Sequence, residues 1–365
     1  RTLYEDKAGR IWIGTAGGGL DRLDPATGRF AHFRHDPADP HSLSHDDVRA
    51  IREDGDGALW VGTFGGGLDR LDPVTGKFRH FRNDPRDPRS LASDNVMALQ
   101  MDEAGTLWVG TDGGGLNRFN RRSGAFTRYL NAPNRPDSLP GNRIYSLYLD
   151  RSGILWIGTY GNGLSRCDLH KKRFVHYLHD PNDPNSLSHN IVWCFWEEPD
   201  GVLWVGTNDG GLNRLDRAGG RFTRYLHDPA DPRSLSHNSV RMVRPDRDGT
   251  IWVATNGGGL DRLDPKTGVF RHYRHDPADP ASLSHDELRM VFRDRGDTIW
   301  GGTYGGGLDR WDPATGGFAH YRSDPDDPAT ISNDYVRTAL EDGDGRLWFG
   351  THGGGLNRFD RATGK

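Results

Sequence analysis

The chain has 365 residues, 34% of them hydrophobic, and its 47 basic and 51 acidic side chains leave a formal net charge of −4. This near balance of charge gives no reason to expect nucleic acid or an anionic membrane surface as a partner. The 50 glycines and 21 prolines would suit a disordered chain, but 11 tryptophans and 15 phenylalanines argue against one, because disordered segments contain few large aromatic residues.

A tryptophan recurs every 48 residues, without insertion or deletion, along the whole chain. This period overrides the two or three domains that the length alone would suggest. Around each tryptophan lies a variant of D-x-x-G-x-(I/L)-W-(V/I)-G-T-x-G-G-G-L-(D/N)-R. We therefore predict a single domain, residues 1–365, made of equivalent units. The repeated residues are Trp12, Trp60, Trp108, Trp156, Trp204, Trp252, Trp300 and Trp348.

One copy, taken in chain order, predicts four short strands. The first is Val48–Arg52, which is followed by a D-G-D-G turn, and the second is Leu59–Thr63, which holds the tryptophan. Three glycines, Gly65–Gly67, then turn the chain, because glycine adopts positive φ without steric cost. The third strand, Leu68–Leu71, and the fourth, Phe78–Arg82, flank a tight hairpin with proline early and glycine late. A longer connection leads into the next copy.

Four short antiparallel strands in a unit of about 40–50 residues are typical of a propeller blade. A helical interpretation is disfavoured, since glycine and proline interrupt every copy. We therefore expect an all-β protein, a β-propeller of eight blades with four antiparallel strands each. The tryptophan of the second strand should supply most of the contact between neighbouring blades, because a buried aromatic side chain removes a large apolar area from water.

The pattern W-(V/I)-G-T-x-G-G-G-L-x-R-x-D-x-x-T-G-x-F resembles the two-component regulator propeller repeat. The resemblance covers the whole chain with few departures: Ala254 stands where other copies have glycine, Gly301 follows Trp300, and the fourth copy has Y-G-N-G at residues 160–163. The resemblance implies a sensor propeller from the periplasmic region of a bacterial hybrid histidine kinase or a related regulator. It also implies a periplasmic or extracellular location, with downstream signalling domains outside this chain.

The two ends of the chain do not complete the eighth unit. Eight repeats of 48 residues would take 384 residues, 19 more than the chain has. The chain starts in a first strand, Arg1–Glu5, and stops after the eighth third strand. The last blade should therefore lack its outer strand, which leaves an open edge that favours edge-to-edge self-association. We interpret the chain as an excerpt from a longer domain; a seven-bladed ring with one displaced unit is the alternative.

The first candidate binding position lies at the start of the first strand, the strand that lines the central channel of a propeller. The residue at this position differs between copies. Arginines of copies six, seven, eight, one and two would form one arc at the channel mouth, facing an arc of Met, Tyr and Trp. Arginine binds carboxylate, sulfate or phosphate through its planar fork, and an aromatic face accepts a sugar ring. Alternatively, the arginines pair with neighbouring Asp and Glu. In copy order the residues are Arg1, Arg49, Met97, Tyr145, Trp193, Arg241, Arg289 and Arg337.

The second candidate position follows the G-T pair and is predicted to lie on the same face. Its residues differ sharply while their neighbours hardly change, which indicates either a ligand contact or an unconstrained loop tip. In copy order they are Ala16, Phe64, Asp112, Tyr160, Asn208, Asn256, Tyr304 and His352.

The connection between copies, typified by residues 35–46, carries carboxylates that raise the question of calcium. It lacks the dense D-x-D-x-D-G arrangement of known calcium loops, and turns stabilised by Asp and Pro explain it better. A zinc cluster is also disfavoured, because the recurring histidines are replaced in other copies. We therefore predict no metal and no cofactor. The histidines are His45, His189, His237 and His285, and their replacements are Ser93, Gly141 and Asn333.

Two cysteines, Cys167 and Cys194, lie inside predicted strands and are expected to be buried free thiols. Two cysteines in so long a chain do not make a disulfide framework. No apolar run approaches the roughly 20 residues that would span a membrane.

Several functions remain open at this point. The resemblance and the polarised mouth favour a sensor that binds a small anionic or carbohydrate ligand. A protein-interaction scaffold, and an amplified or engineered array without a specialised site, are the alternatives. An enzyme such as a polysaccharide lyase or hydrolase is disfavoured, because no nucleophile, general base and orienting group stand out. The residues that occur once, Met97, Tyr145, Trp193 and Trp196, suit contact more than proton transfer.

Overall fold

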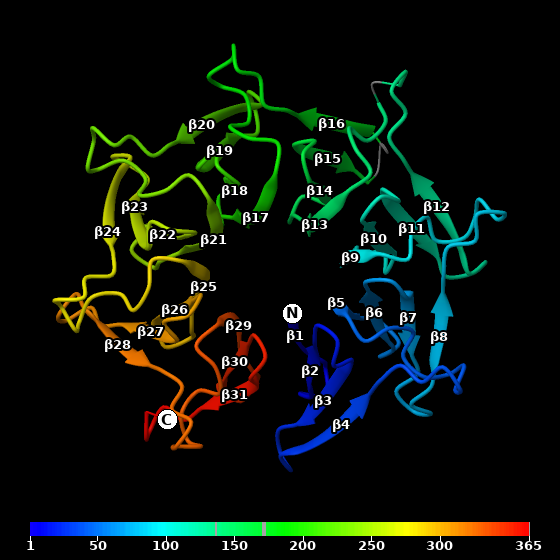
Figure 1. Ribbon diagram of the computed structural model, residues 1–365. Helices are drawn as coiled ribbons and strands as arrows, with labels where there is room; N and C mark the ends of the chain where they lie inside the picture. The colour runs from blue at the N-terminus through cyan, green and yellow to red at the C-terminus, as the bar shows by residue number, and fades with distance from the viewer. Residues whose placement is uncertain (136, 170–172, 365) are drawn as a thin grey trace. The chain divides into compact units, whose positions relative to one another are not determined.

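The computed structural model describes residues 1–135, 137–169 and 173–364. It confirms the predicted fold class: the described residues contain strands and no helix, and they form an eight-bladed β-propeller (Figure 1). Seven blades are four-stranded antiparallel sheets whose strands follow one another in chain order, and the last blade has three strands, as predicted. The seven-bladed alternative is therefore wrong.

The four strands of blade two, for which bounds were predicted, agree with the prediction to within one residue. The first strands are β1 (Thr2–Glu5), β5 (Val48–Glu53), β9 (Val96–Met101), β13 (Ile144–Leu149), β17 (Val192–Glu197), β21 (Val240–Pro245), β25 (Leu288–Arg293) and β29 (Val336–Glu341). The second strands are β2 (Ile11–Gly14), β6 (Leu59–Thr63), β10 (Leu107–Thr111), β14 (Ile154–Thr159), β18 (Leu203–Thr207), β22 (Ile251–Thr255), β26 (Ile299–Thr303) and β30 (Leu347–Thr351).

The two outer strands of the blades complete the sheets. The third strands are β3 (Leu20–Asp24), β7 (Gly67–Leu71), β11 (Leu116–Asn120), β15 (Leu164–Asp168), β19 (Leu212–Asp216), β23 (Leu260–Asp264), β27 (Leu308–Trp311) and β31 (Gly355–Phe359). The fourth strands are β4 (Arg29–Phe33), β8 (Phe78–Phe81), β12 (Ala125–Tyr129), β16 (Arg173–Tyr177), β20 (Arg221–Tyr225), β24 (Val269–Tyr273) and β28 (Phe318–Tyr321).

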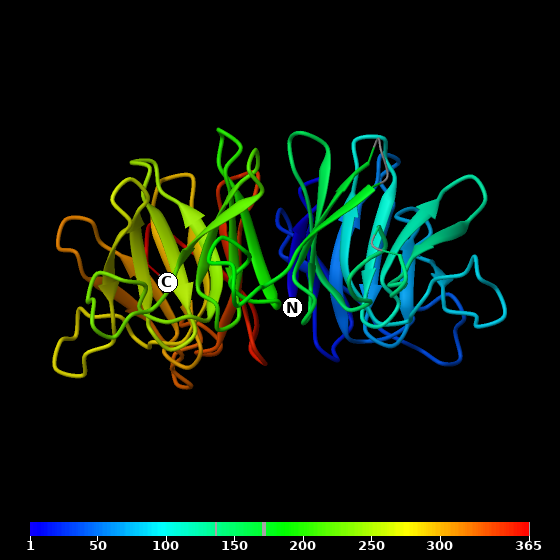
Figure 2. The same cartoon turned by 90° about the horizontal axis from the view of Figure 1, so that it is seen from above.

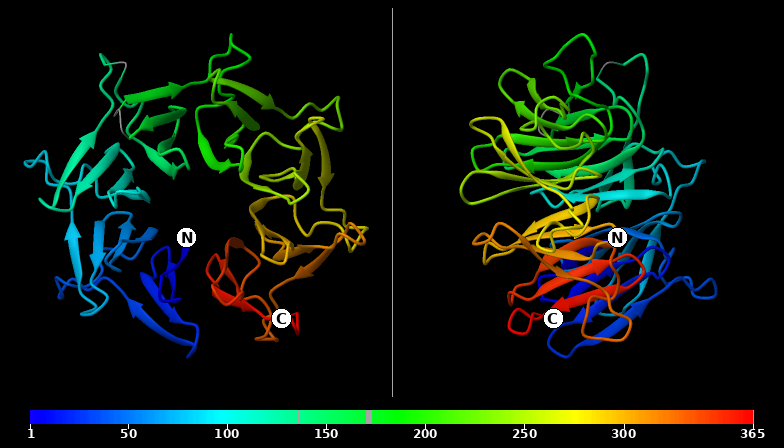
Figure 3. Two further views of the ribbon diagram at one scale, coloured as in Figure 1. Left: turned by 180° about the vertical axis from the view of Figure 1, so that it is seen from behind. Right: turned by 60° about the vertical axis from the view of Figure 1, so that its left-hand side comes forward.

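The blades belong to two compact units of four blades each. The first unit holds residues 1–178 and 190–192, and the second holds residues 179–189 and those from 193 onward. Within the first unit β1, β5, β9 and β13 lie side by side, and within the second β21, β25 and β29 do so. Figure 2 shows the blades of each unit edge-on, with loops at both ends of the strands, and Figure 3 shows their reverse side.

The tryptophan of the second strand lies at the contact between neighbouring blades, as predicted. Trp60 is 1% exposed and packs in one buried cluster with Val96 and Leu99 of the next blade. Its ring lies 5.5 Å from that of Phe81 and 4.9 Å from that of Phe119. Within each unit, a blade therefore buries its apolar face against the next one, which is how short repeats obtain a continuous core.

The aspartate that opens the turn before the second strand holds the tryptophan in place, a role that the sequence pattern did not reveal. In blade two, Asp54 accepts backbone hydrogen bonds from Asp56 (2.9 Å) and Ala58 (3.1 Å). Its other oxygen accepts one from the indole Nε1 of Trp60 (2.9 Å). The indole bond recurs in every blade. Its acceptors are Asp6, Asp54, Asp102, Asp150, Glu198, Asp246, Asp294 and Asp342.

In each second strand a glycine stands two residues after the tryptophan, as Gly62 does after Trp60. This glycine is repeated because a side chain of the next blade lies very close to it. A Cβ at Gly62 would lie 2.5 Å from Cγ1 of Val96. In blade six Ala254 replaces this glycine, and its neighbour in the same buried cluster is Leu288. Leucine is unbranched at Cβ, whereas the corresponding residues of the other blades are Val or Ile. The departure from the repeat is thus matched by a second change in the adjoining blade.

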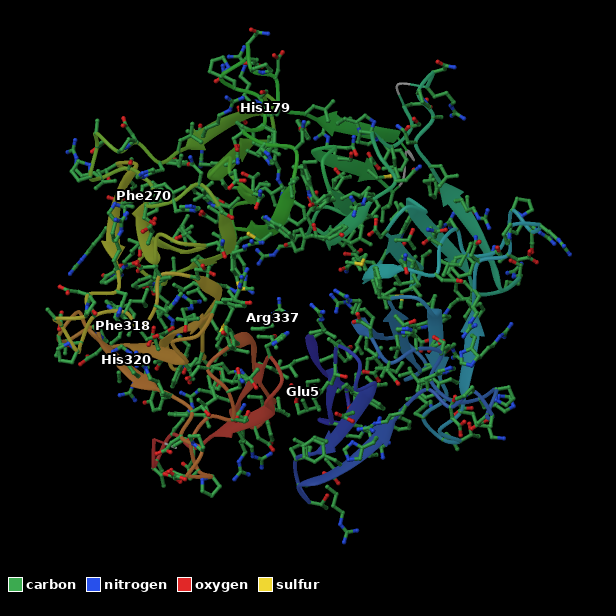
Figure 4. All side chains as sticks on the ribbon, in the orientation of Figure 1. Glu5, His179, Phe270, Phe318, His320 and Arg337 are labelled. Carbon is green, nitrogen blue, oxygen red and sulfur yellow. The ribbon has the colours of Figure 1, made fainter. Side chains whose placement is uncertain are left out.

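Fourth-strand histidines neutralise buried aspartates of the third strand in three blades. The aspartates are 0% exposed, and Oδ1 of each lies 2.6–2.8 Å from the histidine Nδ1. The hydrogen bond to the aspartate raises the pKa of each histidine above its ordinary 6.5, although burial acts in the opposite direction. The pairs are Asp69–His80, Asp261–His272 and Asp309–His320, the last histidine being labelled in Figure 4.

These pairs predict a pH dependence of stability. A histidine whose pKa is raised on folding stabilises the folded state fully below the unfolded value of 6.5, and this contribution is lost as the pH rises through the folded value. We expect replacement of His80, His272 and His320 by Gln to lower the melting temperature more at about pH 6 than at about pH 9. Thermal unfolding followed by circular dichroism measures this, with replacement of the exposed His41 by Gln as control. An equal loss at both pH values would contradict the prediction.

Candidate functional site

The glycine turn of a blade meets the connection that leads to the next blade at one end of the strands, as predicted. In blade two, the N–H of Phe64 donates to the carbonyl of Asp47 (2.8 Å). The N–H groups of Gly65 and Gly67 donate to the carbonyl of Asp94 in the following connection (3.0 and 2.9 Å). Both glycines have positive φ, +109° and +86°, which side-chain-bearing residues rarely adopt. The glycine turn thus places the two varying positions near each other.

A third varying position, which sequence reasoning missed, lies two residues before the first one. It pairs through isolated bridges with the position after the G-T pair, for example Asp112 with Arg143 and Tyr304 with Tyr335. Its residues differ between copies as sharply as the other two sets do, so the same comparison of copies would have found it. From copy two onward they are Asp47, Asn95, Arg143, Ile191, Ser239, Glu287 and Tyr335.

In blades one and two the arginines are paired with a carboxylate. Nη2 of Arg49 lies 2.6 Å from Oδ2 of Asp47, and Nε of Arg1 lies 3.9 Å from its Oδ1. The guanidinium of Arg49 also lies over the ring of Phe64, 5.0 Å from its centroid. For this pair of arginines the structure therefore matches the alternative of charge pairing with a neighbouring Asp.

In blades three and four the predicted aromatic residues form a cluster with Arg143. The rings of Tyr145 and Tyr160 lie 5.1 Å apart, and the guanidinium of Arg143 lies 4.5 Å from the Tyr160 centroid. Nε of Arg143 lies 2.7 Å from Oδ1 of Asp112, and the Tyr145 hydroxyl donates to its Oδ2 (3.4 Å). Tyr160 is 37% exposed, and Met97 is half-buried on β9. This cluster offers aromatic faces, but its charges are paired.

In the second unit Trp193 on β17 stacks with an arginine of the next blade. The guanidinium of Arg241 lies 4.4 Å from the Trp193 ring centroid. The indole Nε1 donates to Oδ1 of Asn208 (3.2 Å), which also accepts from the Ser239 hydroxyl (3.4 Å). The aromatic and arginine positions of the predicted mouth are thus in direct contact here.

Arg241 lies in a field of like charge. Burial lowers the pKa of Arg241, and the charges of Arg289 and Arg337 lower it further, while Asp209 and Glu287 act in the opposite direction. In the part of the chain that the structure describes, Arg241 forms no ion pair, and the Nε atoms of Arg241 and Arg289 are buried without a hydrogen-bond partner. Arg337, on β29, is labelled in Figure 4. Arg241 therefore carries a positive charge that no carboxylate pairs within the described residues.

The remaining candidates of the second unit gather around Arg289. Its guanidinium lies 4.6 Å from the Tyr304 ring centroid, and Nη2 lies 3.8 Å from Oε2 of Glu287. Tyr304 is 42% exposed and packs edge-on against Tyr335 at 4.4 Å, which in turn lies 6.3 Å from the ring of His352. Arg289 thus contacts Tyr304, the first of three rings that lie in a row with Tyr335 and His352.

The carboxylates of the connections stabilise turns, as predicted. Oδ1 of Asp36 accepts the N–H of Ala38, and Oδ1 of Asp39 accepts that of His41, each at 2.9 Å. Within residues 1–135, 137–169 and 173–364, no group of three or more His, Cys, Asp or Glu side chains is placed to hold a metal ion.

Both cysteines are free thiols. Cys167 is buried and Cys194 half-buried, and burial raises the pKa of the two thiols to about 12 and about 11. The structure also contains, over its described residues, no helix with the length and apolar character that crossing a membrane requires.

Comparison with known proteins supports the repeat assignment. Six repeats match the family described as two component regulator propeller, at residues 1–17, 42–65, 90–113, 138–161, 234–257 and 330–353. No curated protein sequence matches the chain.

Among solved structures, the chain is similar to the extracellular domain of a hybrid two component system from B. thetaiotaomicron, with a TM-score of 0.63 and 23% identity over 99% of this chain and 51% of the other. It is also similar to the extracellular domain of a one component system from the same organism (TM-score 0.54, 22% identity, 100% and 52% covered). A third similar structure is virginiamycin B lyase from Staphylococcus aureus (TM-score 0.53, 16% identity, 85% and 94% covered).

The chain spans about half the length of the two extracellular domains. At these identities the structural likeness shows the fold alone, whereas the matched repeats carry the sequence relationship. The chain is thus an eight-bladed β-propeller, and six of its repeats match the two component regulator propeller family.

Proposed function

We propose that the chain is an extracytoplasmic sensing region that binds a small anionic ligand, such as an acidic sugar, in the second unit. The binding site is the arginine–tryptophan cluster, which we define as Trp193, Arg241, Arg289 and Arg337. The observation that carries the proposal is that Arg241 forms no ion pair within the described residues and that its Nε is buried without a hydrogen-bond partner.

A bound anion would supply hydrogen-bond acceptors that the arginines of this cluster lack. The buried Nε–H groups of Arg241 and Arg289 have no acceptor, and buried donors of this kind are normally hydrogen-bonded. A carboxylate, sulfate or phosphate that accepts from them would make charge-assisted hydrogen bonds and would relieve the repulsion between neighbouring guanidinium groups. Tyr304, 42% exposed beside Arg289, offers an aromatic face for the rest of the ligand.

The sensing role and the location rest on the repeats and on the similar structures. Six repeats of the chain match the two component regulator propeller family, and two of the similar structures are extracellular domains of bacterial regulatory systems. A ligand-binding propeller in that setting would pass its signal to domains outside this chain. The likeness to virginiamycin B lyase adds no support for catalysis, because at 16% identity it reflects the fold.

The proposal is tested by calorimetric titration of the chain with galacturonate oligomers and with matched neutral galactose oligomers at low ionic strength. We expect the acidic oligomers to bind, and Arg241→Ala to weaken this binding about 10-fold to 100-fold, since a hydrogen bond to a charged group contributes about 1.5–3 kcal/mol. Arg49→Ala is the matched control, because Arg49 is already paired with Asp47 and lies outside the cluster. Equal binding of both oligomers, or an Arg241→Ala variant that binds like the parent, would contradict the proposal.

A protein-interaction scaffold is the second candidate, and the paired arginines Arg1 and Arg49 favour it. A face whose arginines are already paired with a carboxylate suits a protein partner better than a free anion. Failure of all acidic and neutral oligomers to bind a cooperatively folded chain would favour this candidate.

A further inference from the structure

Asp209 lies in the turn between β18 and β19, at a position where the seven other copies have glycine (Figure 1). Its φ is +62°, in the left-handed region. The seven glycines also have positive φ, between +89° and +120°. Asp209 therefore keeps a backbone conformation that residues with a side chain rarely adopt, at a conformational cost. Strain of this kind is often found at functional sites.

Crowding does not explain why the other copies have glycine at this position. A Cβ added at Gly113 or Gly161 would meet no atom within 4 Å. A Cβ added at Gly257 would have the ring of His237 as its nearest neighbour, 3.6 Å away. Glycine is thus favoured here by its φ and not by a close contact. A side chain fits sterically, and Asp is one of the few residue types that tolerate the left-handed conformation.

Two other departures from the repeat are explained by a neighbouring residue. Within the described residues, Asp297 is the other non-glycine residue with positive φ (+66°), and it pairs with Arg247 at 2.6 Å. Asn162 replaces the middle glycine of the turn in blade four, and it lies against Gly141, where any side chain would collide with it. Asp209 has no such partner, since it is exposed and forms no ion pair in the part of the chain that the structure describes.

Hydrogen bonds join Asp209 to the arginine–tryptophan cluster. Its Oδ2 accepts a hydrogen bond from Nδ2 of Asn208 (2.7 Å). Oδ1 of Asn208 accepts one from the indole of Trp193 (3.2 Å), whose ring lies against the guanidinium of Arg241. The amide of Asn208 therefore holds the Asp209 carboxylate beside the cluster. The charge of Asp209 also raises the pKa of Arg241, against the effect of burial.

Asp209 and Arg241 thus carry opposite charges near each other without forming an ion pair. An anion bound at Arg241 would be repelled by the Asp209 carboxylate, whereas a ligand with an ammonium group beside its acid group would be attracted by both residues. A charge of this kind selects between ligands by what it disfavours as well as by what it attracts. Ligand selection gives a reason for Asp at a position where glycine is less strained.

We propose that Asp209 determines specificity, and that the arginine–tryptophan cluster takes a zwitterionic ligand, such as an amino sugar that carries an acid group. The acid group binds to Arg241. The ammonium group donates to Oδ1 of Asp209, which accepts no hydrogen bond within the described residues. This inference rests on the proposed function, because it requires an anion to bind at Arg241. It narrows that function from anions in general to ligands that carry both charges.

The test is calorimetric titration of the full chain with glucosamine 6-sulfate and with glucose 6-sulfate at about pH 6, where the amine is protonated. The two sugars differ only in the group at carbon 2, which is ammonium in one and hydroxyl in the other. We expect the parent chain to bind the amino sugar about fivefold more tightly, as for a favourable exposed ion pair. Asp209→Gly should remove this preference. It should weaken binding of the amino sugar about fivefold, and glucose 6-sulfate should bind as well as before or more tightly, because a repelling charge is gone.

Two further variants separate specificity from a structural role. Damage to the turn would weaken binding of both sugars alike, whereas loss of the Asp209 charge changes their ratio. Asp209→Asn keeps a residue that tolerates the left-handed conformation but removes the charge, so it should also abolish the preference. Asp297→Gly is the matched control, since it makes the same change at positive φ in a turn at the other end of the strands, and it should leave the preference intact. Asp209→Gly should melt no lower than the parent chain.

The outcomes distinguish this inference from the proposed function. If the parent chain binds both sulfates equally and Arg241→Ala weakens both, the proposed function stands and the role of Asp209 is wrong. If neither sulfate binds, the proposed function and this inference fail together. A preference for the amino sugar that survives in both Asp209 variants would also overturn the inference.

Discussion

Trp60→Ala should lower the free energy of unfolding of the chain by about 3–5 kcal/mol, the range found for truncation of large buried aromatic side chains. Trp60 is 1% exposed, and its ring contacts Phe81 of its own blade and Phe119 of the next one. Its removal leaves a cavity at the contact between two blades, where the sheets on both sides restrict relaxation. Urea unfolding of the full chain, followed by far-UV circular dichroism, measures the loss.

Trp60→Phe is the control for the size of this cavity. Phenylalanine keeps an aromatic ring in the contact but cannot donate to Asp54, so its cost should lie clearly below that of alanine. A cost of alanine under about 1 kcal/mol would mean that blade-to-blade packing does not depend on this side chain.

Asp54→Ala should destabilise the chain by about 3–5 kcal/mol, because it removes one partner of a buried, charged hydrogen-bond network. The Asp54 side chain is fully buried, and it accepts from two backbone N–H groups, from Trp60 and from Arg121 of the next blade. Alanine would leave the indole N–H of Trp60 without its acceptor, and the Arg121 guanidinium would keep only Asp56, 3.4 Å away. Asp54→Asn, which retains one oxygen acceptor, should cost less, and an equal cost for both substitutions would contradict this account.

The Asp54 carboxylate also predicts how the cost of this substitution depends on pH. Burial alone would raise the pKa of Asp54, but hydrogen bonds from Trp60 and Arg121 outweigh it and hold the pKa below its ordinary 3.8. A carboxyl with a depressed pKa stabilises the folded state above the unfolded value, and this contribution is lost as the pH falls through the folded value. The difference in stability between parent and Asp54→Ala should therefore shrink below about pH 3.8.

The repeated residues serve folding, and the residues that vary between blades are available for recognition. The tryptophan, its acceptor and the close-packed glycine recur because every blade must pack against the next, as Gly62 against Val96 shows. The loop residues have no such constraint, so blade two presents Phe64 where blade seven presents Tyr304. A binding surface made by varying only these loops costs the fold little, which fits the proposed sensing role.

The sequence by itself determined the architecture. The 48-residue period, alternation of apolar and polar residues, and glycine and proline turns are local signals, and they gave the number of blades, the strand bounds of blade two and the three-stranded last blade. Local signals suffice here because each blade is a short meander whose neighbours in space are neighbours in the chain.

Only the tertiary structure decided which charges are paired. Arg49 and Arg241 occupy the same repeat position, yet Arg49 meets Asp47 at 2.6 Å while Arg241 stacks on Trp193 and forms no ion pair within the described residues. The bond from Trp60 to Asp54 was equally hidden. The physical reason is that the partner of a side chain depends on its rotamer and on the loops of adjoining blades. A repeat pattern shows where a side chain lies in a blade, but it does not show which group that side chain contacts.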